Sequence, residues 1–473
     1  FMAEGGINAA LNTKDENDSP EEHFTDTIKA ACGLADPNAV WGMTQAAPEL
    51  VHWLLKLGVK FNMSGYDDVD LRNFGGQKKK RTAFAQSDTG KQIMTAMIDA
   101  VRRKEASGMV ERFSHHSFLT LRLCGNICCG CVIRDEYSQE TVELPGDAVI
   151  VATGGMHGLF GNTTGSLSNT GEVTAELFRL GVPLANGEMI QYHPTTVKCG
   201  GKRMLISEAA RGEGGRLFAM KDGKQWYFME EKYPELGNLM PRDITAREIW
   251  KVSHESEVFL DMTEISEEII SNKLSGLADD CMTYLHKDIR KEPVSVLPGI
   301  HYFMGGILVD EQHRTPIQNL YAAGECCAQY HGANRLGGNS LLGALYGGRV
   351  AAKSACEQAD VVDLSCATQI DFPPASQISE IKQLNKVMQE TMGVVRNENT
   401  LLNGIQTVQA LTGNLPLLGM AVLKSALARK ESRGAHWRED YPKSNDDDYL
   451  KTTVARFDGK QIQISFVPVP ERR

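Results

Sequence analysis

The sequence predicts an α/β fold followed by a helical C-terminal region. In segments 147–155 (DAVIVATGG) and 319–325 (NLYAAGE), a short apolar run meets a glycine turn, which is typical of a buried parallel strand that ends where the backbone approaches a ligand. From 377 to 432, leucine, methionine and valine recur every three or four residues, which indicates amphipathic helices.

Each further element has its own local signal. Ser19 and Asp36 precede prolines and predict two helix starts, the second helix ending at Gly58. The basic run 78–81 is interpreted as a solvated surface loop, with a specific anion-binding role as the alternative. Residues 108–152 alternate with a period of two, as short strands do. Helices are expected over 172–181 and 340–358, a linker over 360–375 and a last strand over 462–467.

Composition excludes several classes of protein. The chain has 473 residues, enough for two to four domains, and 50 basic against 60 acidic side chains give 50 − 60 = −10. An acidic chain is a poor nucleic-acid binder, because neutralising phosphate supplies most of that affinity. No apolar run reaches the length of a membrane-spanning helix, so membrane association is expected only through a partner.

The eleven cysteines have no framework spacing, which is typical of a reducing compartment such as the cytoplasm. Cys124, Cys128, Cys129 and Cys131 lie in an alternating segment without a second CxxC or a histidine pair, so they are interpreted as strand residues and not as zinc ligands. No metal site is predicted, and no spacing suits an iron–sulfur cluster. The N-terminus has no secretory signal pattern.

Five polar motifs lie between residues 191 and 341: QYHPT (191–195), SEAARGEGG (207–215), MPRD (240–243), HYFMGG (301–306) and HGANRLGGNSL (331–341). We expect them in glycine-rich loops, with the MPRD arginine in a turn. Guanidinium groups bind carboxylates bidentately and imidazoles add charge-assisted bonds, so the combination favours a dicarboxylate ligand. Any one of the histidines alone could equally be a structural residue.

In this order and spacing, the motifs closely resemble those of the flavoprotein subunit of the succinate dehydrogenase and fumarate reductase family, whose wider group includes L-aspartate oxidase. AEGGINAAL (3–11) resembles the flavin-contacting turn and SRGAHWREDYP (432–442) the C-terminal signature. The most specific stretch is HGANRLGGNSLLGALYGGR (331–349). The resemblance covers nearly the whole chain.

The resemblance implies a Rossmann-like FAD-binding domain split in sequence over 1–184 and 301–360. It also implies an inserted α+β capping domain over 185–300 and a C-terminal helical domain and tail over 375–473. The first strand, the GxGxxG turn and the ribose-binding acid of that fold are absent, so we expect an N-terminally truncated chain that lacks the first βαβ unit. In covalent-flavin relatives the attachment histidine precedes the position of Phe1, so covalent attachment is not predicted either way. The helical segment between 340 and 432 is shorter than in relatives.

Site residues follow by resemblance, position by position. FAD contacts are expected at Ala3, Glu4, Gly5, Gly6, Thr153, Gly154, Gly155, Glu172, Glu325, Arg335, Ser340 and Leu341. Glu172 stands where relatives usually carry aspartate. The dicarboxylate is expected to bind His193, Ser207, His301 and Arg335, and Ser207 stands where threonine is usual.

The implied reaction interconverts fumarate and succinate by hydride transfer at flavin N5. Arg242 matches the family's proton-exchanging arginine, and Glu208 and Arg211 match the relay that reprotonates it. An arginine pKa above 12 makes this a poor donor in water, but a closed, dry site favours the transfer while charge builds on the substrate.

The resemblance further implies an iron–sulfur partner subunit and a membrane anchor, which would place the chain in the cytoplasm or at the cytoplasmic face of the inner membrane. Three readings stay open: this respiratory subunit; L-aspartate oxidase or a free-standing soluble fumarate reductase; and a non-catalytic fragment. Methionine at position 304 is typical of the succinate and fumarate enzymes, whereas the sequence SEAAR (207–211) is more similar to that of the aspartate oxidases. The direction of the reaction is not encoded in these motifs.

Overall fold

The computed structural model describes residues 4–66, 68–359, 372 and 377–473. Its N-terminal part contains the helices α1 (Pro20–Ala30), α2 (Pro37–Leu57) and α3 (Thr89–Ala106) and a small antiparallel sheet in the order β1 (Ile7–Asn8), β3 (Thr82–Ala83) and β2 (Leu71–Arg72). Ser19 and Asp36 cap α1 and α2 as predicted, and Gly58 ends α2 with a φ of 100° that favours glycine. Helix α3 was not predicted.

The basic run 78–81 is not simply a solvated loop. The Arg81 side chain is fully buried, donates to Asp18 over 3.1 and 2.8 Å and lies 3.0 Å from Asp26. The backbone N–H of Lys80 donates to the Glu16 carboxylate. The prediction of a solvated face is therefore wrong for Arg81, because two buried carboxylates compensate its charge.

The two predicted strand-to-glycine turns are neighbours in space. β7 (Val149–Val151) and β17 (Leu320–Ala322) pair in parallel, so the prediction of parallel strands is confirmed. β17 is buried, but Ile150 of β7 is 40% exposed, because β7 pairs only with β17 among the described residues. The long helix α10 (Asn339–Gln358) follows β17 along the chain, and α4 (Glu172–Arg179) follows β7.

Residues 108–152 form strands as predicted: an antiparallel sheet in the order β4 (His116–Cys124), β5 (Ile127–Asp135) and β6 (Thr141–Pro145) precedes β7. Cys128, Cys129 and Cys131 are free thiols on β5. Among the described residues, no group of three or more metal-ligating side chains is placed to hold a metal ion.

The segment between α4 and β16 contributes two antiparallel sheets. One has the order β10 (Lys202–Leu205), β9 (Ile190–Cys199), β15 (Leu297–Phe303), and the other β12 (Lys224–Trp226), β11 (Arg216–Lys221), β13 (Val258–Asp261), β14 (Val294–Ser295). The helices here are α5 (Glu208–Gly212), α6 (Phe228–Lys232), α7 (Arg242–Val252), α8 (Glu267–Lys273) and α9 (Ser275–Asp280). The loop predictions are wrong: Arg242 begins α7, and His193 and His301 lie in strands β9 and β15.

The C-terminal segment contains α11 (Ile378–Thr391), α12 (Glu398–Val408), α13 (Asn414–Ala428) and α14 (Asp446–Tyr449), so the predicted helices are present. It also contains a hairpin, β19 (Lys451–Phe457) and β20 (Ile462–Pro468). This hairpin extends a sheet whose order is β18 (Cys327–Ala328), β16 (Gly306–Leu308), β8 (Leu184–Ala185), β19, β20. The predicted linker over 360–375 lies almost wholly outside the described residues.

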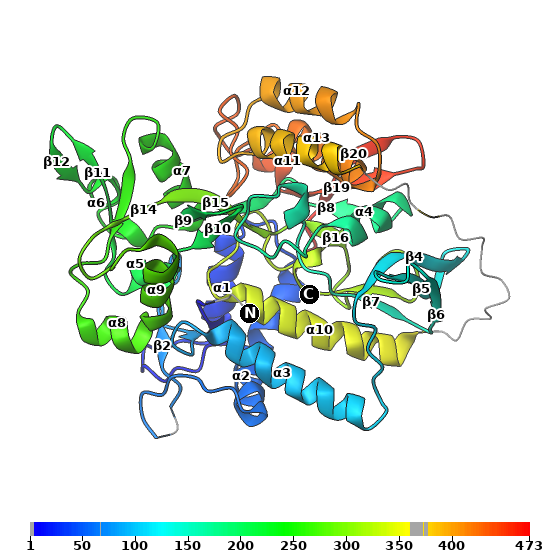
Figure 1. The fold of residues 1–473 in the computed structure, drawn as a ribbon, viewed down its shortest axis with the longest axis horizontal. Helices are drawn as coiled ribbons and strands as arrows, with labels where there is room; N and C mark the ends of the chain where they lie inside the picture. The colour runs from blue at the N-terminus through cyan, green and yellow to red at the C-terminus, as the bar shows by residue number, and fades with distance from the viewer. Residues whose placement is uncertain (1–3, 67, 360–371, 373–376) are drawn as a thin grey trace.

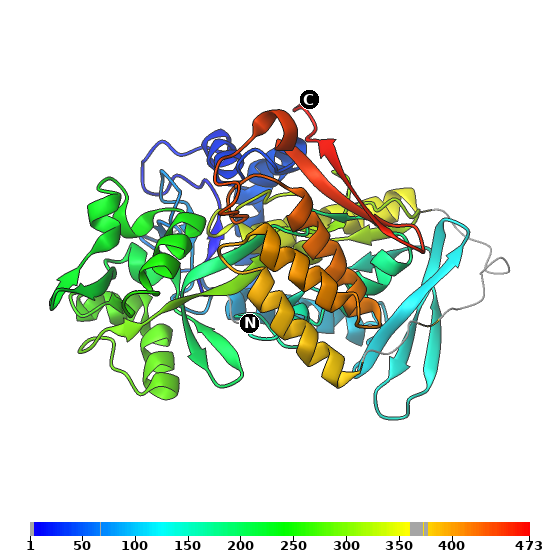
Figure 2. The same cartoon turned by 90° about the horizontal axis from the view of Figure 1, so that it is seen from above.

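Figures 1 and 2 show how these parts are arranged: the green unit of α5–α9 lies at one end, the β4–β6 sheet lies at the other, and α11–α13 cover one face between them. Helix α7 packs on β9 and β15, which connect the green unit to the rest of the molecule. Within the described ranges, no helix is both long and apolar enough to cross a membrane.

A buried ion network fixes the C-terminal segment. Arg429 is fully buried and donates to Glu188 and Glu431, each over 2.7 Å. Arg429→Met is expected to lower the free energy of unfolding by about 3–5 kcal/mol, because buried Glu188 loses its ion-pair partner and Glu431 keeps only Arg433. Denaturant unfolding checks this result, with Arg314→Met as control. Arg314 forms an exposed pair with Asp310, so its loss should cost less than about 1 kcal/mol, and equal effects would contradict the argument.

Candidate active site

A cavity of about 790 Å³ lies where the N-terminal turn, strands β9 and β15 and the start of helix α10 meet. It collects side chains from five distant motifs. The predicted residues that line it are Glu4, Gly5, Gly6, His193, Ser207, Glu208, Arg242, His301, Glu325, Arg335, Ser340 and Leu341. The structure thus brings together every predicted substrate-binding residue.

Six predicted residues are not among the cavity's lining. Ala3 lies outside the described residues. Glu172 is exposed at the start of α4 and Thr153 is exposed after β7, while Gly154 lies beside it half-buried. Gly155 packs against Glu325, since a Cβ there would lie 2.6 Å from Glu325 Oε1. Arg211 lies behind Glu208, as described below.

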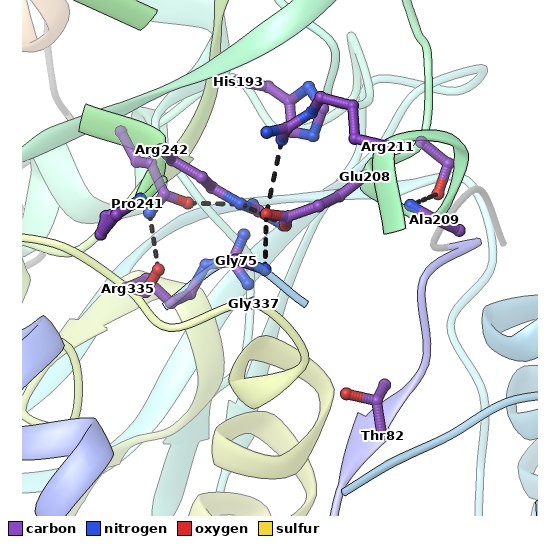
Figure 3. A network of polar contacts seen from close by, with 12 residues as sticks. Gly75, Thr82, His193, Glu208, Ala209, Arg211, Pro241, Arg242, Arg335 and Gly337 are labelled. Atoms are coloured by element: carbon purple, nitrogen blue, oxygen red, sulfur yellow. Dashed lines mark hydrogen bonds and ion pairs between the residues drawn. The ribbon is translucent and has the colours of Figure 1, made fainter. Parts of the chain in front are cut away.

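Arg242 is held in a fixed orientation by two acceptors. Its Nε and Nη2 donate to Glu208 Oε2 over 2.9 and 2.6 Å, and its Nη1 donates to Gln191 Oε1 over 3.1 Å. Gln191 in turn donates to the backbone carbonyl of Arg335 over 2.8 Å. Figure 3 shows Arg242 and Glu208 facing each other above Arg335. The start of α7 therefore directs a buried guanidinium into the cavity beside a second arginine.

Glu208 lies between two guanidinium groups. Its Oε1 accepts from the Gly75 N–H over 3.2 Å and lies 3.4 Å from Arg211 Nη2. Burial raises the pKa of Glu208, but Arg242 and Arg211 outweigh it and hold the pKa below its ordinary value. Glycine is required at Gly75, because a Cβ there would lie 2.7 Å from Glu208 Oε1. The result is a buried chain of charges that runs Arg242, Glu208, Arg211.

Burial keeps two of the cavity's histidines, His193 and His301, neutral. His193 and His301 have ring centroids 5.1 Å apart, and His301 Nδ1 lies 2.7 Å from Thr164 Oγ1. Burial lowers the pKa of both well below the ordinary value, and nearby Arg242 lowers both further. Each ring therefore retains one N–H donor at neutral pH and carries no charge. Ser207 begins α5, where its Oγ accepts from the Ala209 N–H.

Arg335 is buried with its guanidinium 4.3 Å above the Tyr302 ring, and no group in the described part of the chain bonds to its Nε. Burial lowers its pKa to about 9, with Arg242 contributing in the same direction. Two buried arginines share one cavity, and the carboxylate of Glu208 is committed to Arg242 and Arg211. An anionic ligand that contacts both arginines would satisfy the remaining donors.

The opposite part of the cavity has glycine walls and a helix start. Ser340 and Leu341 lie in the first turn of α10, whose N-cap, Gly338, has a φ of 83° and no side-chain cap. The unpaired N–H groups of such a turn favour an electron-rich ligand. Nearby, the Glu4 Oε2 atom is buried and has no hydrogen-bond partner among the described residues, and burial together with Asp280 raises the pKa of Glu4 to about 8.

Several cavity residues were not predicted. They are Phe74, His157, Thr164, Gly165, Ser166, Leu167, Ser168, Asn169, Lys202, Leu205, Tyr302, Gly338 and Ala344. Most come from the loop after η1 (His157–Leu159) and from β10, which have no distinctive spacing. The glycine turn at 153–155 is the one sequence signal that points toward His157.

Comparison with known proteins identifies the family of the chain. Residues 1–341 match the FAD binding domain family, and residues 411–472 match the fumarate reductase flavoprotein C-terminal family. The succinate dehydrogenase flavoprotein subunit of Bacillus subtilis is 37% identical over all of this chain and 91% of that protein. The chain belongs to the succinate dehydrogenase and fumarate reductase flavoprotein family.

Other members of the family are also similar. The 8-methylmenaquinol:fumarate reductase flavoprotein subunit of Wolinella succinogenes is 31% identical over all of this chain and 86% of that protein. An L-aspartate oxidase of Nostoc is 32% identical over 96% of this chain and 86% of that protein. A quinol fumarate reductase structure from E. coli has a TM-score of 0.89 at 27% identity, covering 99% of this chain and 89% of that one.

Membership confirms the predicted fold class, an FAD-binding α/β fold with a C-terminal helical region, and the flavoprotein is an oxidoreductase whose cofactor is FAD. The cavity residues fit this group. The glycine walls leave room for a flat ring, and the uncapped start of α10 and the unpartnered Arg335 Nε supply donors for its oxygen and nitrogen atoms.

Acid is expected to destabilise this flavoprotein. Burial lowers the pKa of six histidines, which are His23, His193, His301, His313, His331 and His436. Below the unfolded-state pKa near 6.5, the unfolded chain binds more protons than the folded chain. The free energy of unfolding therefore decreases as the pH is lowered, by up to about 1.4 kcal/mol per pH unit for each histidine. Four carboxyl groups whose pKa burial raises oppose this trend, and they are Glu4, Asp18, Asp243 and Asp280.

The measurement is the melting temperature of FAD-free protein between pH 7.5 and 5.5. It should fall steadily with acidification, and a constant or rising melting temperature would show that these imidazoles are not buried in neutral form.

Proposed function

We propose that this flavoprotein interconverts fumarate and succinate, with Arg242 exchanging a proton at one substrate carbon. The observation that carries the proposal is the pairing of Arg242 with Glu208 inside a cavity that also contains Arg335 and two neutral histidines. When bound, FAD exchanges a hydride with the neighbouring carbon through N5. One hydride and one proton add across the double bond, so fumarate becomes succinate without change of charge.

The neutral histidines and Arg335 are assigned to the substrate carboxylates. His193, His301 and Ser207 offer uncharged hydrogen-bond donors, and Arg335 offers a guanidinium with an unpartnered N–H. Donors that polarise one carboxylate draw electron density from the double bond and make it electrophilic. Burial strengthens each of these bonds, because no water competes for them.

The proton path is assigned to the chain Arg242, Glu208, Arg211. After Arg242 gives up its proton, the Glu208 carboxylate, 2.6 Å away, relays a proton to it from Arg211, which lies 3.4 Å from Glu208. The same path runs in reverse for succinate oxidation. The lowered pKa of Glu208 keeps it ionised between turnovers, so Arg242 stays protonated and oriented.

Electron exchange with the flavin is assigned to an iron–sulfur partner subunit. A membrane anchor subunit would hold this chain and the iron–sulfur subunit at the cytoplasmic face of the inner membrane. The relatives from Bacillus and Wolinella are named as flavoprotein subunits, which supports a complex of this kind. The division into an FAD-binding domain (1–184 and 301–360), a capping domain (185–300) and a C-terminal helical domain (375–473) is part of the proposal. The capping domain would carry Arg242 over the cofactor and close the site.

A steady-state assay tests the proposal. FAD-loaded protein with reduced viologen dye should oxidise the dye only when fumarate is added, and should oxidise succinate with an acceptor dye. Dye oxidation that fumarate does not stimulate would contradict the proposal.

The second candidate is L-aspartate oxidase, favoured by the 32% identity to the Nostoc enzyme. L-Aspartate with oxygen should then give hydrogen peroxide, and succinate should not reduce the dye. Comparing the two substrates in one preparation separates the candidates.

A further inference from the structure

His157 lies in the cavity, but the proposed reaction does not use it. It follows the glycine turn at 153–155 as the first residue of η1, and its side chain is 3% exposed. A buried imidazole at the wall of a cofactor cavity needs partners for both ring nitrogens.

Three groups fix the orientation of the ring. Nδ1 lies 2.9 Å from Thr163 Oγ1, and that hydroxyl also accepts from the Gly165 N–H. The ring lies against Gly165, where a Cβ would be 2.2 Å from the ring, so only glycine is compatible with it. The Phe303 ring packs edge-on, with centroids 5.0 Å apart.

The remaining nitrogen faces a carboxylate. His157 Nε2 lies 3.6 Å from Glu325 Oε1, which also accepts from the Phe303 N–H over 3.0 Å. A lone pair on Nε2 would repel that carboxylate oxygen, so the proton belongs on Nε2, and Thr163 donates to Nδ1. Oε1 is thereby fixed, and within the described part of the chain no protein group bonds to Glu325 Oε2.

We propose that His157 is a positioning residue. It fixes the orientation of the Glu325 carboxylate so that Oε2 accepts a hydrogen bond from a sugar hydroxyl of FAD. The proposal rests on the predicted contact of Glu325 with FAD. Two observations support it. Gly155 packs closely against Glu325, because a Cβ there would lie 2.6 Å from Oε1, and the Glu325 side chain, 19% exposed, lines the cavity.

The test titrates FAD-free full-length protein with FAD and follows the quenching of flavin fluorescence. His157→Leu should raise the Kd for FAD about tenfold, because the Glu325 carboxylate loses the imidazole N–H that faces Oε1 at 3.6 Å. His157→Gln, which can return an N–H to Oε1, should recover most of the affinity. The control is His116→Leu, whose imidazole lies at the same 3.6 Å distance from Asp135 outside the cavity, and which should leave the Kd unchanged.

A double-mutant cycle with Glu325→Gln separates positioning from packing. If His157 acts through Glu325, the double variant should bind FAD no more weakly than Glu325→Gln alone. Additive losses, or a His157→Leu variant within twofold of wild type, would overturn the proposal. A Glu325→Gln variant with unchanged affinity would overturn it too, while fumarate turnover by the wild type would leave the proposed function intact.

Discussion

Arg242→Lys is expected to lower fumarate–succinate turnover by about 10²–10⁴-fold, the range of a lost general acid. Lysine keeps the positive charge but is shorter and cannot form the forked contact by which Arg242 Nε and Nη2 both reach Glu208. The ammonium would therefore lie away from the substrate carbon. FAD and dicarboxylate binding should be largely retained, because Arg335 and the histidines remain.

The matched control for this variant is Arg247→Lys. Arg247 lies on the same helix but stacks on Trp437, outside the cavity, so its turnover should match wild type. The measurement is kcat for fumarate together with the Kd for succinate. Near-normal turnover by Arg242→Lys would contradict the assignment of Arg242 as the proton donor.

Glu208→Gln is expected to lower kcat by about 10²-fold or more, because the relay loses its only carboxylate. The amide keeps the shape of the side chain but leaves Arg242 and Arg211 as buried like charges without an anion between them. The pH dependence of kcat should also change, since the carboxylate that relays protons to Arg242 is gone. Glu208→Asp, which keeps the charge at a shorter reach, should retain more activity.

Glu248→Gln provides the control for the glutamate variant. Glu248 is also buried and also bridges two cations, Lys232 over 2.7 Å and Lys251 over 3.3 Å, but it lies outside the cavity. If both glutamine variants lost turnover equally, the effect of Glu208→Gln would be structural and the relay would be wrong.

The sequence predicted the parts of the fold that local chemistry determines. Ser19, Asp36 and Gly58 define helix ends through their own caps, and the two glycine turns mark parallel strands. Arg242 was placed in a turn because Pro241 precedes it, but a proline at the N-cap is compatible with a helix start. His193, which precedes a proline, and His301, which precedes a glycine pair, were placed in loops, although they lie on paired strands.

The site was predictable by type but not in full. The motifs identified the arginines, histidines and Glu208, because each stands in a distinctive run of residues. They gave no role to Gln191 or His157, whose contacts join segments far apart in the chain. The buried state of Arg81 was missed for the same reason, since Asp18 and Asp26 lie more than 50 positions away.

The most direct test of the proposed reaction is the visible absorption of the FAD-loaded protein without oxygen. Succinate should bleach the oxidised flavin band, and fumarate added to the chemically reduced protein should restore it. The same titration of Arg242→Lys should show binding without these changes. A flavin band that ignores both dicarboxylates but is bleached by L-aspartate would contradict the proposed function and assign the chain to the aspartate oxidases.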